Sequence, residues 1–72
     1  MLTDYEKKEM IQSNINQLEY NIRDNLVQIE EILVLEPEDS ETINAIERHI
    51  EDNRSKINTL QNALNELNIA SS

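Results

Sequence analysis

The fold is decided by residues 22–53, IRDNLVQIEEILVLEPEDSETINAIERHIEDN, because the apolar patterns on the two sides of Pro37 mirror each other. On each side, apolar residues and one Asn recur at alternating steps of three and four, which keeps one helix face against a partner helix. The position numbers of facing residues, such as Ile32 with Ile43, add to 75. Positions equidistant from a turn become neighbours when a chain folds back on itself. The pattern therefore predicts two antiparallel helices.

The mirrored pattern continues outward from this stretch toward both ends of the chain. We call its members the hairpin seam. They are Ile11, Ile15, Leu18, Ile22, Asn25, Ile29, Ile32, Ile43, Ile46, Ile50, Asn53, Ile57, Leu60 and Leu64. The expected fold is all-α, a two-helix antiparallel coiled-coil hairpin.

Local signals predict where the helices begin and end. Thr3 and Glu6 have the spacing of a capping box, and Pro37 disfavours helical angles at the residue before it. Either Asp39 or Ser40 can cap the second helix. A single continuous helix is the rival structure, and Pro37 argues against it. We expect one hairpin over residues 1–72, with a helix over about 3–35, a turn at 36–39, a helix over about 40–68 and a frayed tail at 69–72.

The first helix carries more apolar residues than one partner helix can cover. Some widen the face beside the seam, and others recur every seven residues on another side. This excess predicts self-association, most simply two hairpins forming a four-helix bundle as a homodimer. The candidate oligomer or partner face consists of Tyr20, Leu26, Val27, Leu33 and Val34.

Composition excludes several classes of function. The net charge of −9, with only six Lys and Arg residues, argues against binding nucleic acid phosphates or an anionic membrane surface. No segment is apolar enough to span a bilayer, and residues 1–6 do not resemble a signal peptide. We therefore expect a cytoplasmic protein with no nucleic acid partner and no membrane partner.

The turn is strongly acidic. Eight acidic residues and no Lys or Arg lie between Arg23 and Arg48. The residues nearest the turn form a candidate docking site for a basic partner, which we call the acidic tip. They are Glu36, Glu38, Asp39 and Glu41. The alternative is a turn whose charges serve only to keep it solvated.

Two polar residues interrupt the seam. Asn25 and Asn53 fall in adjacent layers, so we expect their amides to bond to each other and to help set the register. His49 is the only histidine and the chain has no Cys, so no metal site is expected. Phosphate-binding loops and nucleophile motifs are absent from the sequence. The sequence predicts no enzyme activity and no cofactor.

The first 18 residues, MLTDYEKKEMIQSNINQL, resemble the start of small uncharacterised helical proteins of large tailed phages, cyanophages in particular. The expected topology is also similar to that of the plasmid copy-control hairpin, which dimerises into a four-helix bundle and binds RNA. That family presents basic and aromatic residues to RNA, and this chain has six basic residues and no Phe. The phage resemblance implies no particular activity, and it places the protein in the host cytoplasm.

Three functional hypotheses follow. The leading one is a non-enzymatic, self-associating interaction or accessory protein, with a possible host protein as partner. The second is an acidic inhibitor or nucleic-acid mimic that binds a host nucleic-acid-binding or defence protein through the acidic tip. The third is a protein that holds a small ligand between the protomers of an oligomer.

Overall fold

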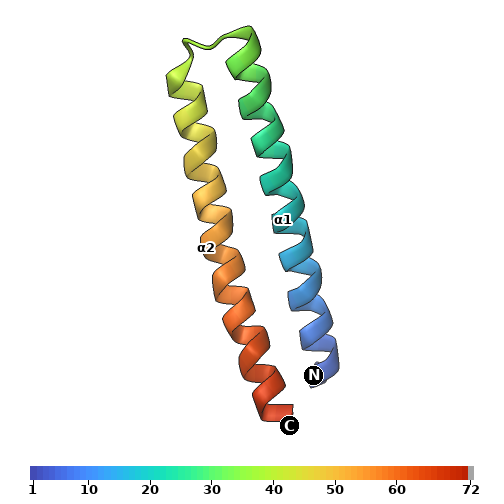
Figure 1. The fold of residues 1–72 in the computed structure, drawn as a ribbon. Coiled ribbons are helices and arrows are strands. Elements are labelled where there is room, and N and C mark those ends of the chain that lie inside the picture. Colours follow the sequence, from blue (N-terminus) through green and yellow to red (C-terminus); the bar gives the residue numbers. More distant parts are fainter. Residues whose placement is uncertain (72) are drawn as a thin grey trace.

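The computed structural model describes residues 1–71 and shows two long antiparallel helices joined by a short turn (Figure 1). Helix α1 spans Asp4–Leu35 and helix α2 spans Ser40–Ser71. Each helix has 32 residues, or about 48 Å at 1.5 Å per residue, which accounts for the longest dimension of 52 Å. The described part contains no strand. The molecule is the predicted antiparallel helical hairpin.

Helix α1 begins at the capping box predicted from Thr3 and Glu6. The backbone N–H of Glu6 donates to Thr3 Oγ1 at 3.1 Å, and the backbone N–H of Thr3 donates to Glu6 Oε1 at 3.2 Å. Asp4 and Glu6 also place negative charge in the first turn, where the helix dipole favours it. These contacts satisfy backbone donors that a helix otherwise leaves unpaired.

Helix α1 ends at Leu35, with Glu36 between it and the proline. Glu36 leaves the helix with φ −141° and ψ 67°, while its backbone N–H still donates to the carbonyl of Ile32 at 2.7 Å. Pro37 provides no N–H to extend the ladder and disfavours helical angles at Glu36. The chain therefore reverses at the position that the sequence predicts.

Helix α2 is capped by Asp39. Its Oδ1 accepts a hydrogen bond from the backbone N–H of Thr42 at 3.2 Å. Of the two candidate caps, Asp39 therefore performs the role, and Ser40 is the first helical residue. Asp39 is also partly buried, unlike the glutamates beside it.

The predicted end of α2 near Asn68 was too early. The helix continues to Ser71, so it ends three residues beyond the predicted position. The physical reason is that residues 69–71 include no Gly or Pro, and Ala70 is the residue type most favourable to a helix. Ser72, the last residue of the predicted tail, lies outside the described residues.

All fourteen residues of the hairpin seam are buried or partly buried. Ile15 and Ile50 are the most enclosed apolar side chains of the described part, with exposed fractions of 2% and 5%. Leu18 and Leu60 line one groove, and Ile29 and Ile50 line another, so each pair lies on adjoining parts of the two helices. The core is a single line of contacts along the hairpin.

This core is thin for the mass of the chain. The accessible surface is 5520 Å², whereas a folded globular protein of 8.4 kDa is expected to expose about 4,600 Å². The difference arises because each helix packs on one neighbour and leaves the rest of its circumference open. A large part of the surface is therefore free to meet a partner.

Candidate functional site

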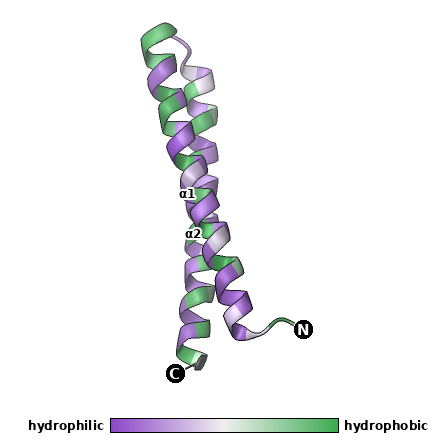
Figure 2. Ribbon diagram, turned by 90° about the vertical axis from the view of Figure 1, so that its right-hand side faces the viewer, coloured by the Kyte–Doolittle hydropathy of each residue, from purple (hydrophilic) through white to green (hydrophobic). Residues whose placement is uncertain are grey.

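The residues of the candidate partner face are all exposed on α1, and we call them the apolar strip. The strip consists of Tyr20, Leu26, Val27, Leu33 and Val34. Their exposed fractions run from 44% for Leu26 to 79% for Val34. Figure 2 shows the run of hydrophobic residues at the turn end of α1. The hairpin leaves these side chains uncovered.

Helix geometry arranges the strip in two lines along α1. Residues three, four or seven apart lie on the same side of a helix that turns about 100° per residue. Tyr20, Val27 and Val34 are seven apart, as are Leu26 and Leu33. The centre of the strip lies about 120° around α1 from the centre of the seam. The strip therefore begins beside the seam, at Leu26 and Leu33, and continues to the far side of α1, at Tyr20, Val27 and Val34.

Two charged residues lie within the strip. Arg23 is three residues from Tyr20 and Leu26, and Glu30 is three residues from Val27 and Leu33. Both side chains are exposed, and at this spacing they lie beside the apolar residues. Sequence reasoning missed Arg23 and Glu30 as members of this face. Their spacing of three residues from members of the strip could have placed them on this face. A search for apolar residues alone does not find charged ones.

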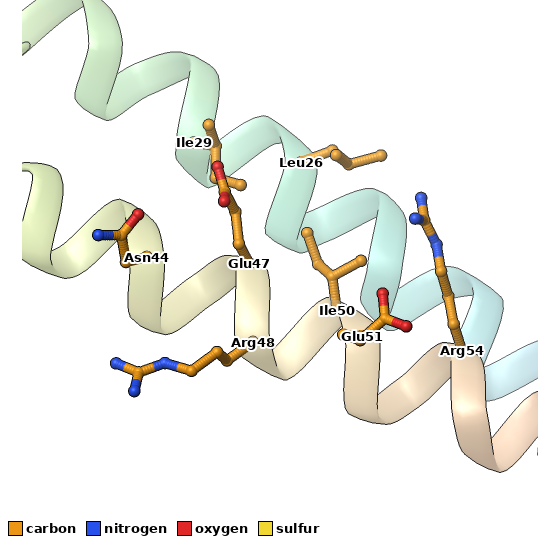
Figure 3. A pocket seen from close by; sticks show the side chains of 8 residues that line it. All are labelled: Leu26, Ile29, Asn44, Glu47, Arg48, Ile50, Glu51 and Arg54. Atoms are coloured by element: carbon orange, nitrogen blue, oxygen red, sulfur yellow. The ribbon is translucent and has the colours of Figure 1, made fainter.

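An open groove of about 820 Å³ runs between the helices next to Leu26. Its lining residues are Leu26, Ile29, Asn44, Glu47, Arg48, Ile50, Glu51 and Arg54 (Figure 3). The apolar part of this lining is Leu26, Ile29 and Ile50, while four of the five remaining residues are charged. In Figure 3 the side chain of Arg48 points away from α1. The charged residues all belong to α2, so the α2 side of the groove is polar.

A second open groove of about 490 Å³ lies further from the turn. It is lined by Asn14, Gln17, Leu18, Ser55, Lys56, Thr59 and Leu60. Lys56 is its one charged lining residue, and Leu18 and Leu60 belong to the seam. Neither groove is an enclosed cavity of the kind that holds a small ligand.

The two asparagines of the seam do not form the expected hydrogen bond to each other. The Nδ2 atoms of Asn25 and Asn53 are both buried and have no hydrogen-bond partner among the described residues. Asn53 is only 3% exposed. Adjacency of the layers is therefore not sufficient to pair the two amides, and backbone carbonyls nearby already accept bonds within the helices. The hairpin therefore keeps two unpaired amide donors in its core.

The acidic tip separates into two kinds of residue. Glu36, Glu38 and Glu41 are exposed, whereas Asp39 is partly buried and caps α2. No group of acidic or histidine side chains in the described part is arranged to hold a metal ion. His49 is exposed on α2. The tip therefore presents three exposed carboxylates at the turn.

Neither helix, over the residues described, has a stretch apolar and long enough to cross a bilayer. The geometric features open to a partner thus include the apolar strip, the two grooves and the acidic tip. No protein-family model, curated protein or solved structure matches the chain.

Proposed function

We propose that this protein is a non-enzymatic helical interaction protein that self-associates through the apolar strip of α1. The exposure of the strip residues is the observation that supports this proposal. Contiguous exposed apolar residues bordered by polar ones are typical of protein–protein contact sites. We further propose that the protein is a phage accessory factor that acts in the host cytoplasm. This proposal rests on the resemblance of its first residues to phage proteins.

The thin core gives a physical reason for association. A single line of seam contacts is small support for 72 residues against the conformational entropy lost on folding. Covering a half-exposed Leu or Val side chain contributes about 1 kcal/mol, from about 25 cal/mol per Å². Association through the strip therefore stabilises the hairpin as well as joining two chains.

Sedimentation velocity over a concentration series tests this proposal. The wild-type chain should change from monomer to dimer as its concentration rises. Val27→Glu should weaken dimerisation at least about tenfold, because it places a charge at the centre of the strip without disturbing the seam.

Ala45→Glu is the matched control, since Ala45 is exposed on α2 and lies outside the strip. It should leave the dissociation constant unchanged. A wild-type chain that stays monomeric at every concentration would rule out self-association.

The acidic tip supports a second candidate function, that of an inhibitor that occupies a basic nucleic-acid-binding protein. The observation in its favour is the cluster of exposed carboxylates at Glu36, Glu38 and Glu41. The triple variant with Gln at these positions removes the three charges and retains the Asp39 cap, so the fold is preserved. Competition with duplex DNA for a basic DNA-binding protein measures the effect. Equal competition by wild type and variant would eliminate this function.

A further inference from the structure

Four of the five residues of the apolar strip have a self-complementary order along α1, and Val34 is the exception because its equidistant position is Glu19. The midpoint between Leu26 and Val27 divides the strip so that Tyr20 on one side and Leu33 on the other are equidistant from the centre. In a two-fold contact between antiparallel helices, residues equidistant from the axis meet. A two-fold axis at this midpoint brings Leu26 of one copy to Val27 of the other, and Tyr20 to Leu33.

The charged residues of the strip obey the same symmetry. Arg23 and Glu30 are also equidistant from the Leu26–Val27 midpoint. The two-fold contact therefore brings Arg23 of each copy to Glu30 of the other, which makes two ion pairs between opposite charges. Both side chains are exposed, so they are accessible to a second copy. A parallel contact in register would instead place Arg23 against Arg23 and Glu30 against Glu30.

We propose that a second copy of this chain covers the strip, with the two α1 helices antiparallel and the two-fold axis between Leu26 and Val27. This inference rests on the proposed self-association and specifies its geometry. It differs from the simple four-helix bundle, because the contact is made by α1 with α1 rather than by both helices of each hairpin.

The surface of α2 supports a contact through α1 alone. The one large exposed hydrophobic residue on the described part of α2 is Ile69, which is far from the turn. Beside the strip, α2 presents the charged residues of the first groove, among them Glu47, Glu51 and Arg54. A bundle that buried this side of both helices would have to desolvate these charges, which is costly unless each is paired.

The charge of the acidic tip favours the antiparallel orientation. The tip begins about 15 Å along α1 from the proposed axis, so the tips of two antiparallel copies lie about 30 Å apart. Charges at that distance are screened at physiological salt, where the Debye length is about 8 Å. A parallel dimer would bring the two tips to within about one interhelical distance, roughly 10 Å, where they repel.

A charge-exchange experiment tests this geometry. In an Arg23→Glu homodimer the introduced carboxylate faces Glu30, and in a Glu30→Arg homodimer the introduced guanidinium faces Arg23. Each single variant should therefore dimerise about tenfold more weakly than the wild type. An equimolar mixture of the two should form a heterodimer, because one chain then carries only negative charge at these two positions and the other only positive charge. The double variant R23E/E30R should recover the wild-type homodimer.

Native mass spectrometry of the mixture and sedimentation of each chain give the readouts. Lys56→Glu is the control, because it makes the same change of charge as Arg23→Glu at an exposed position outside the strip. It should dimerise as the wild type does. Circular dichroism confirms that each variant keeps its helices.

The outcomes separate the two proposals. A wild-type chain that never dimerises overturns the proposed function and this geometry with it. If the wild type dimerises, both single variants dimerise equally well and their mixture forms no heterodimer, the antiparallel α1 contact is wrong. Self-association itself would still hold. Weakened single variants with a restored mixture and double variant establish the contact.

Discussion

At the scale of single residues, the unpaired amides of Asn25 and Asn53 reduce the stability of the hairpin. A buried donor without a partner loses its bonds to water and gains none, which costs about 1–3 kcal/mol. Polar residues at core positions of coiled coils are used to restrict register and partner number. The two amides therefore lower the stability of the hairpin near its middle. They also favour one register, because a shifted register would place each amide against different apolar residues.

Replacing Asn53 by Leu should raise the free energy of unfolding by about 1–3 kcal/mol, because Leu has a similar shape and no unpaired donor. Urea denaturation followed by circular dichroism measures the change. Asn58→Leu, at an exposed position of α2, should change stability by less than about 0.5 kcal/mol. A loss of stability in Asn53→Leu would show that the amide is paired in solution.

At the scale of the helices, capping residues decide where each element begins. Thr3 and Glu6 exchange two hydrogen bonds at the start of α1, and Asp39 accepts one at the start of α2. Local sequence is sufficient to predict such caps, because the partners lie within three residues. The end of α2 has no comparable stop signal, which is why it continues to Ser71 beyond the position predicted.

Replacing Thr3 by Ala should destabilise the hairpin by about 1 kcal/mol, since the capping hydroxyl is lost. Thermal melting by circular dichroism should show a lower midpoint. Thr59→Ala provides the comparison, because the Thr59 hydroxyl donates to the carbonyl of Ser55 inside α2 and caps nothing. That variant should be neutral or slightly more stable. Equal destabilisation by the two changes would contradict the role of the capping box.

At the scale of the whole molecule, one line of seam contacts holds two helices together over 52 Å. Each helix of 32 residues gains most of its stability from the other, since long helices in water depend on packing of their apolar face. The hairpin should therefore unfold cooperatively rather than one helix at a time. A defect in the seam should affect both helices together.

Replacing Leu18 by Asp should destabilise the hairpin by about 3 kcal/mol or more, because it removes a seam contact and introduces an unpaired charge. Far-ultraviolet circular dichroism should show loss of most of the helix signal. Ser13→Asp introduces the same charge at an exposed position of α1 and should retain the wild-type spectrum. Full helicity and a cooperative transition in Leu18→Asp would show that the seam register is wrong.

The sequence by itself determined the antiparallel hairpin, because helical periodicity and the mirrored spacing around Pro37 are properties of order along the chain. It also determined the capping box, since that motif is local. Only the tertiary structure decided that Asn25 and Asn53 remain unpaired, because a hydrogen bond depends on the separation and direction of atoms on different helices. It likewise decided that the apolar strip stays open. Burial depends on how many neighbours an element has, and here each helix has one.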